Sequence, residues 1–352
     1  MNKPLQSLIH TGTKLYLDSV LPAEVDKNIA WGAVGATSNP AIISGIVDSG
    51  ELNGPIESLI GDGHDDETIA WELTDRLVKD AQQKFAAVHK RTNGNAGWVS
   101  FELDPLLEDP TAGLSVAERA KHYVKLGKQW SAGHTNRMIK VPATEGGIAA
   151  LEELAAAGVT LNVTLIFTTD QYRQAREAIW CGAKRHGDLK NFKSVYSIFV
   201  SRIDVYTEKS LPSLSADAQG MVGIVNAKRV WAENQVFWSD KQCTLDQELI
   251  FASTGVKDPS LPAWKYVEAL AGSDIQTNPP DTNEAVAHSN LTFTRKVDLL
   301  PSKKVLDEID AALDINDMHR VLMEEGVAKF VKPQRSFLKV VADKRKQLAT
   351  AK

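Results

Sequence analysis

A lysine lies inside an otherwise apolar, strand-like run, Met138-Ile139-Lys140-Val141-Pro142. Lysine is rarely buried unless it is paired with an acid or employed in chemistry. Burial favours the neutral amine, which is a nucleophile that can form a Schiff base with a carbonyl substrate. The run therefore indicates either a catalytic nucleophile at Lys140 or a structural lysine paired to a carboxylate inside the core.

Short apolar, β-branched runs alternate with helical patterns along most of the chain. Helices are indicated by apolar stripes at four-residue steps, by a capping box at Ser115 to Glu118 and by a helix-ending Gly158. The predicted helices cover 65–89, 115–130, 144–157, 169–184 and 218–238. The predicted strands cover 14–18, 33–37, 97–103, 138–141, 160–167, 194–200, 249–252 and 274–277.

Strand followed by helix, repeated eight times, predicts an α/β fold in which parallel strands close into a single (β/α)8 TIM barrel. The alternative is an open doubly wound sheet, which usually carries a glycine-rich loop after its first strand. No such loop follows residues 14–18. We expect a barrel catalytic domain over 1–300 and, over 301–352, a C-terminal helical extension packed on the barrel.

Barrel geometry predicts where the functional groups lie, because active sites form at the C-terminal ends of barrel strands. The predicted strand ends carry a lysine, two carboxylates, hydroxyls and cations that could serve a common site. These are Asp18, Thr37, Ser38, Asn39, Glu102, Lys140, Asn162, Thr164, Ser197, Arg202, Ser253 and Lys257.

Composition narrows the class of protein. The 352 residues are 43% hydrophobic and 24% charged, which is ordinary for a soluble globular protein. The formal net charge of -5 argues against nucleic acid as the main partner. The two cysteines, Cys181 and Cys243, are too few for a disulfide scaffold or a zinc site. The opening residues show no signal peptide and no apolar run approaches the roughly 18 residues of a membrane span, so we expect a cytoplasmic protein.

Four motifs, in order, resemble those of the transaldolase family within the Schiff-base aldolases. The resemblance covers roughly residues 14–290, and the order and spacing of the motifs make it specific. The motifs are Gly35-Ala36-Thr37-Ser38-Asn39-Pro40, Arg137-Met138-Ile139-Lys140-Val141-Pro142-Ala143-Thr144, Leu161-Asn162-Val163-Thr164-Leu165-Ile166-Phe167 and Ser197-Ile198-Phe199-Val200-Ser201-Arg202-Ile203-Asp204.

The resemblance implies a transferase of the pentose phosphate pathway that needs no metal or organic cofactor. Such enzymes move a dihydroxyacetone unit from a ketose phosphate (sedoheptulose 7-phosphate or fructose 6-phosphate) to an aldose phosphate (glyceraldehyde 3-phosphate or erythrose 4-phosphate). By resemblance, Lys140 forms the iminium, Asp18 takes the C4 hydroxyl proton, and Glu102 acts through a water held by Thr164. Ser38, Asn39, Asn162, Ser197 and Phe199 match substrate-binding positions.

The phosphate region departs from one branch of the family. Arg202 and Ser253 match the family's phosphate positions, and that branch places an arginine close after the serine. This chain reads Ser253-Thr254-Gly255-Val256-Lys257, so Lys257 is the candidate substitute. Lysine would act there as a point charge where arginine binds phosphate with two parallel hydrogen bonds.

The sequence leaves two further functions open. The aldolase branch, which cleaves fructose 6-phosphate without a phosphorylated acceptor, carries glutamine and tyrosine where this chain has Glu102 and Phe199. That pair favours transfer over simple cleavage. A catalytically idle barrel would be expected to lack Lys140, Asp18 or Glu102, and all three are present. We expect sugar phosphates as partners, no nucleic acid and no membrane, with a homodimer as the candidate assembly.

Other residues have simpler interpretations. The histidines lack metal-ligand spacing, and the scattered tryptophans are better explained by packing than by base stacking. A basic C-terminal stretch from Lys329 to Lys346 is typical of a solvated helix face, and the alternative is that part of it covers the barrel mouth.

Overall fold

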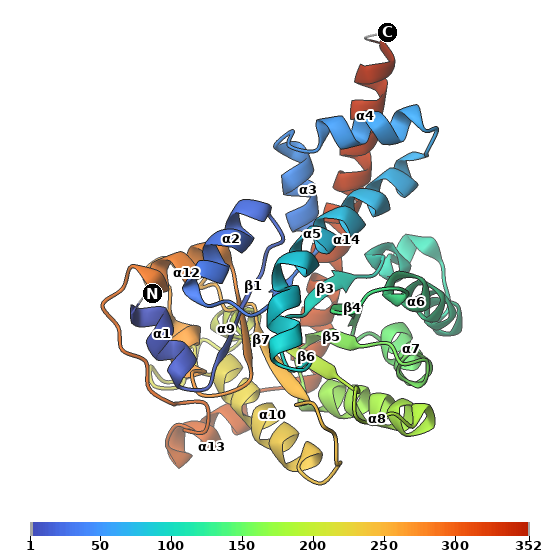
Figure 1. Cartoon of the computed structure of the whole chain (residues 1–352). Helices are drawn as coiled ribbons and strands as arrows, with labels where there is room; N and C mark the ends of the chain where they lie inside the picture. Colours follow the sequence, from blue (N-terminus) through green and yellow to red (C-terminus); the bar gives the residue numbers. More distant parts are fainter. Residues whose placement is uncertain (1–2, 351–352) are drawn as a thin grey trace.

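The computed structural model describes residues 3–350, and the side chains of residues 3–347. Parallel strands β1 to β8 close into a barrel in chain order (Figure 1), so the predicted (β/α)8 architecture is confirmed and the open sheet is excluded. The strands are β1 (Lys14–Leu17), β2 (Ala36–Thr37), β3 (Val99–Glu102), β4 (Arg137–Pro142), β5 (Leu161–Ile166), β6 (Ser194–Phe199), β7 (Glu248–Ala252) and β8 (Ile275–Asn278).

Helices cover the outside of the barrel and extend beyond it. None within residues 3–350 combines the length and apolar character that crossing a membrane requires. The helices are α1 (Lys3–His10), α2 (Pro22–Trp31), α3 (Pro40–Asp48), α4 (Asn53–Gly61), α5 (Asp66–Arg91), η1 (Pro105–Glu108), η2 (Pro110–Ala112), α6 (Val116–Ser131), α7 (Glu145–Ala156), α8 (Thr169–His186), α9 (Ser201–Ser210), α10 (Val222–Trp238), α11 (Lys265–Ala269), α12 (Pro280–Ala287), α13 (Lys303–Ala312) and α14 (Ile315–Thr350).

The predicted helices are present, with small shifts at their ends. Side-chain caps explain several starts: Asp65 caps α5, and Ser115 and Glu118 form the expected capping box of α6. Helix α10 begins at Val222 and not at the predicted residue 218, because the segment before it forms turns such as the bond from the Met221 amide to the Ala218 carbonyl. The second strand is shorter than predicted and begins at Ala36.

Helices α3 and α4 were not predicted from the sequence. Helix α3 is apolar on nearly every face, so it lacks the stripe that marks an amphipathic helix. Helix α4 has no side-chain cap and contains Gly54 and Gly61. Both pack against α14, which rises beside them and away from the barrel (Figure 1).

Helix α14 joins the barrel to this group of helices. Its Phe337 and Val341 are buried in the same apolar cluster as Ile43 and Ile56 of α3 and α4. The prediction of C-terminal helices is therefore confirmed. The division into 1–300 and 301–352 stays a prediction, and its outermost residues, 1–2 and 351–352, lie outside the described part of the chain.

Apolar side chains fill the middle of the barrel. Tyr16, Met138, Val195, Ile250 and Ile275, from five different strands, are fully buried in one cluster. Below them an ion-pair network closes the N-terminal end, where Glu248 lies 2.7 Å from Lys14 Nζ and 2.5 Å from Lys193 Nζ. With this end packed and paired, the polar groups at the C-terminal ends of the strands are left to form a site.

Gly35 is required by the packing of Tyr16 inside the barrel. A Cβ added at Gly35 would lie 2.3 Å from Tyr16 Cζ and 2.7 Å from the Trp98 carbonyl oxygen. We expect Gly35→Ala to lower the free energy of unfolding by about 1–3 kcal/mol, the usual cost of overpacking a core, measured by urea denaturation. Gly45→Ala in α3 is the control, because a Cβ added there would have no neighbouring atom within 4 Å. Equal destabilisation of the two variants would contradict this account.

Candidate active site

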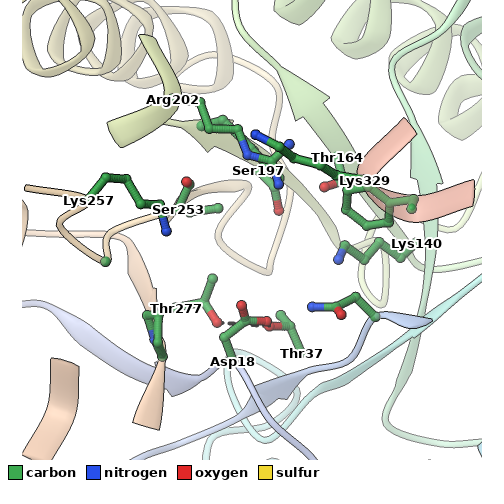
Figure 2. Close-up of a pocket in the computed structure, with 16 residues that line it drawn as sticks. Asp18, Thr37, Lys140, Thr164, Ser197, Arg202, Ser253, Lys257, Thr277 and Lys329 are labelled. Atoms are coloured by element: carbon green, nitrogen blue, oxygen red, sulfur yellow. Dashed lines mark hydrogen bonds between the residues drawn. The ribbon is translucent and has the colours of Figure 1, made fainter. Parts of the chain in front are cut away.

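A cavity of about 320 Å³ opens at the C-terminal ends of the strands (Figure 2). It is lined by residues from the strand ends, from the loops after them and from α14. These are Asp18, Thr37, Asn39, Lys140, Thr164, Ser197, Phe199, Arg202, Ala252, Ser253, Gly255, Lys257, Thr277, Pro279, Lys329 and Phe330. Most of the residues predicted from the sequence therefore meet in one place.

Lys140 projects into this cavity from β4, and its side chain is only 7% exposed. Its Nζ donates to Glu102 Oε2 at 3.1 Å and to the Ser38 carbonyl oxygen at 3.2 Å. Glu102 and Lys140 are register partners on β3 and β4, so the two side chains emerge on the same face of the sheet. The Phe330 ring centre lies 5.5 Å from Nζ. The amine is thus held in place by a carboxylate, a carbonyl and an aromatic face.

Glu102 is a buried carboxyl with an altered acidity. Burial raises its pKa from 4.5 to about 7, and the negative charge of Asp18 adds to this, while Lys140 opposes it. A carboxyl with a pKa near neutrality can both accept and return a proton at physiological pH. Glu102 is therefore suited to proton transfer at the Lys140 nitrogen.

Asp18 is oriented by a chain of hydroxyl groups at the ends of neighbouring strands. Thr37 Oγ1 donates to Asp18 Oδ1 at 2.7 Å, and Thr277 Oγ1 lies 2.9 Å from Thr37 Oγ1. Figure 2 shows this group on the side of the cavity across from Arg202 and Ser197. The arrangement fixes one carboxylate oxygen and leaves the other to face the cavity.

A second polar chain lies beside Lys140. Ser197 Oγ donates to Asn162 Oδ1 at 2.7 Å, and Asn162 Nδ2 donates to Ser100 Oγ at 2.9 Å. Asn162 is the register partner of Lys140 on β5 and is fully buried. The chain holds the Ser197 hydroxyl at the cavity wall.

Thr164 lies where β5 departs from regular geometry. The register with β6 shifts between Val163 and Ile166, and Leu165 has a φ of +59°. Bulges of this kind re-aim neighbouring side chains and are common beside active sites. Among the described residues, Thr164 Oγ1 is buried and has no hydrogen-bond partner. Its hydroxyl is therefore available to a group in the cavity.

The predicted phosphate residues gather on one wall. Arg202 lies at the start of α9, where burial lowers its pKa, and its guanidinium stacks over the Phe199 ring at 5.0 Å. Burial also lowers the pKa of Lys257, and the positive charge of Arg202 adds to this effect. Ser253 adopts a φ of +55°, with its Oγ 2.9 Å from Ser201 Oγ.

Three predicted residues lie behind the cavity wall instead of lining it. Ser38 donates its hydroxyl to the Ser100 carbonyl at 2.8 Å and reaches the site only through its own carbonyl, which accepts from Lys140. Glu102 and Asn162 each accept a hydrogen bond from a residue that lines the cavity, Lys140 and Ser197, respectively. Asn39 does line the cavity, although its Oδ1 also caps α3 by accepting from the Ile42 amide.

The sequence analysis missed several residues of the cavity. Thr277 lies one residue before the end of β8, so the strand-end rule that predicted Thr37 could also have found it. Lys329 and Phe330 carry no such signal, because they belong to α14 and approach the barrel from outside. The basic stretch that includes Lys329 is typical of a solvated face, yet the alternative, that part of it covers the barrel mouth, is correct for Lys329.

Comparison with known proteins accounts for this arrangement. The model of the transaldolase/fructose-6-phosphate aldolase family matches residues 15–341. The chain belongs to this family. A transaldolase of Arthrobacter sp. (strain FB24) is 33% identical over all of this chain and 99% of its own length. A transaldolase of Saccharopolyspora erythraea is 34% identical over the same shares. A transaldolase of Trichodesmium erythraeum is 28% identical over 90% of this chain and 89% of its own length. The resemblance seen in the four motifs is confirmed.

The raised pKa of Glu102 predicts a pH-dependent stability. Between about pH 4.5 and pH 7 the native state keeps a proton that the unfolded chain releases, so this carboxyl lowers stability as pH rises through that window. As the pH rises from about 4.5 to about 7, we expect the free energy of unfolding of Glu102→Gln to increase relative to that of wild type by about 1–3 kcal/mol. Urea denaturation of both proteins at several pH values measures this gain. A difference that stays constant with pH would contradict it.

Proposed function

We propose that this chain transfers a dihydroxyacetone unit from a ketose phosphate to an aldose phosphate through a Schiff base at Lys140. The donors would be sedoheptulose 7-phosphate or fructose 6-phosphate, and the acceptors glyceraldehyde 3-phosphate or erythrose 4-phosphate, in the non-oxidative pentose phosphate pathway. The observation that carries the proposal is the buried amine of Lys140, which lines the cavity and lies 3.1 Å from the Glu102 carboxyl behind the cavity wall.

Schiff-base formation requires a neutral amine and several proton transfers. Glu102 is in position to accept a proton from Nζ, which frees the lone pair to attack the C2 carbonyl of the ketose. The resulting carbinolamine loses its hydroxyl as water, with Glu102 as the acid. In our proposal a water held by Thr164 relays these protons, which would use the unpaired Oγ1 of that residue.

Cleavage of the C3–C4 bond follows from the positive charge on the iminium nitrogen. Asp18 takes the proton of the C4 hydroxyl, an aldehyde forms at C4, and the bonding electrons move into the iminium to give an enamine. The hydrogen bond from Thr37 keeps the Asp18 carboxylate facing the cavity. The aldose phosphate leaves, and addition of the enamine to an acceptor aldehyde reverses these steps. Water then releases the product and restores Lys140.

Binding of the sugar phosphate would fall to Arg202, Ser253 and Lys257. Arg202 Nη1 is buried and has no hydrogen-bond partner within the described residues, which is costly unless a ligand supplies one. The start of α9 also places the positive end of a helix dipole at this wall. Asn39 and Ser197 would hold the hydroxyls of the donor, with Asn162 orienting Ser197 from behind the cavity wall.

Transfer is favoured over simple aldol cleavage by the pair Glu102 and Phe199. Phe199 packs edge-on against Phe167 at 5.4 Å and lies under the Arg202 guanidinium. It therefore presents an apolar edge to the cavity, where a tyrosine would offer a proton donor.

We further propose that the enzyme is cytoplasmic, in keeping with its unpaired cysteines. We also propose that it forms a homodimer and that its partners include neither nucleic acid nor a membrane.

Borohydride reduction should trap fructose 6-phosphate on the protein, because it converts an iminium into a stable amine. We expect Lys140→Ala to abolish the adduct, with peptide mass spectrometry locating the wild-type adduct at Lys140. Lys228→Met is the matched control, since Lys228 is also buried and burial lowers its pKa to about 8, yet it lies outside the cavity. An adduct at another lysine would refute the assignment.

An acceptor-dependent assay separates transfer from cleavage. With fructose 6-phosphate as donor, we expect steady release of glyceraldehyde 3-phosphate only when erythrose 4-phosphate is added. Without acceptor the release should stop near one equivalent of enzyme, because the three-carbon unit stays on Lys140. Steady release without acceptor, at a rate similar to that with acceptor, would favour the aldolase alternative.

A further inference from the structure

The cavity wall that carries Arg202 and Lys257 has one more cation than the proposed phosphate site includes. Lys329 of α14 lines the same cavity as Arg202 and Lys257. Within the described residues, neither Arg202 nor Lys257 forms an ion pair. Lys329 has only Glu325 at 3.7 Å, one turn earlier in its own helix. Figure 2 shows Arg202 and Lys329 on the side of the cavity away from Asp18.

The cations of this wall repel one another, and the nearby carboxylates, among them Glu325 and Asp18, oppose this effect. After burial, the charges of Arg202 and Lys329 are the groups that lower the pKa of Lys257. Such a wall is stabilised by a ligand with more than one negative charge, because each cation then gains a partner. A phosphate monoester carries up to two negative charges and has several acceptor oxygens, so it fits this charge pattern.

The placement of Lys329 depends on how α14 meets the barrel. Gly326 lies against β5, where an added Cβ would come within 3.2 Å of Leu165 Cδ2. Phe330, one turn later, is 7% exposed and reaches over Lys140. These two contacts seat one face of the helix on the barrel. They direct the neighbouring Lys329 side chain, which is half-exposed, to the mouth of the cavity.

We propose that Lys329 binds the phosphate of the substrate together with Arg202 and Lys257, so that α14 contributes to the preference for phosphorylated aldehydes. The inference rests on the proposed function, since it assigns a specificity residue to that reaction. In this proposal Lys329 acts on the phosphate at the far end of the sugar and has no part in the chemistry at Lys140. Its loss is therefore expected to weaken recognition of phosphate and to leave the chemistry of the Schiff base intact.

The test compares two acceptors that differ only in the phosphate, erythrose 4-phosphate and erythrose, with fructose 6-phosphate as donor. For each, kcat/KM of the acceptor is measured by the release of glyceraldehyde 3-phosphate. We expect Lys329→Gln to lower kcat/KM for erythrose 4-phosphate about 10-fold, the effect of one charged hydrogen bond, and to leave that for erythrose within about twofold. Lys329→Arg should restore most of the preference.

Lys332→Gln is the control for a change of charge in α14, because Lys332 faces a separate groove beside Arg119 and Ile148. It should leave both acceptors unchanged. Equal losses for the two acceptors in Lys329→Gln would show a structural role and overturn the inference, as would an unchanged preference for erythrose 4-phosphate. Wild-type protein without a borohydride adduct would refute the proposed function itself. An unchanged preference in a variant that still forms the adduct would refute only the role of Lys329.

Discussion

The contact between Lys140 and Glu102 is the interaction on which the rest of the site depends. Two ionisable groups share a buried space, and burying either alone would cost several kcal/mol of free energy. The raised pKa of Glu102 shows that the protein does not fully stabilise its charged form. The pair is therefore poorly suited to holding the fold together and well suited to exchanging a proton. Because the two residues are register partners on β3 and β4, the sheet itself sets the distance between their side chains.

The two ends of the barrel use charge in opposite ways. At the N-terminal end, Glu248 is satisfied by Lys14 and Lys193, so the charges there stabilise the closed sheet. At the C-terminal end, Arg202 and Lys257 lack ion-pair partners among the described residues, and Thr164 lacks a hydrogen-bond partner. Groups that remain unsatisfied in the protein are those that a substrate can satisfy. These unsatisfied groups lower the stability of the fold, and a substrate that supplies their partners gains binding free energy.

The sequence was sufficient for the barrel and for the residues at its strand ends, and insufficient for what the backbone and distant helices add. Lys140 and Thr164 could be placed because strand periodicity and barrel geometry fix where strand ends meet. The carbonyl of Ser38 as a partner of Lys140 had no signal, since every residue has a carbonyl. The bulge at Leu165 had none either, because a positive φ at leucine is set by tertiary packing. Lys329 could not be assigned to the cavity from residue order, because its position depends on how α14 packs.

The position of α14 in the chain has a consequence for the order in which the enzyme is assembled during synthesis. All eight strands, and with them Lys140, Glu102 and Asp18, precede residue 280, whereas Lys329 and Phe330 belong to α14, the last helix of the described chain. During synthesis the N-terminal part of a chain emerges first. The strand ends that carry Lys140, Glu102 and Asp18 are thus synthesised before the aromatic cover over Lys140 exists. The mouth of the cavity is closed last.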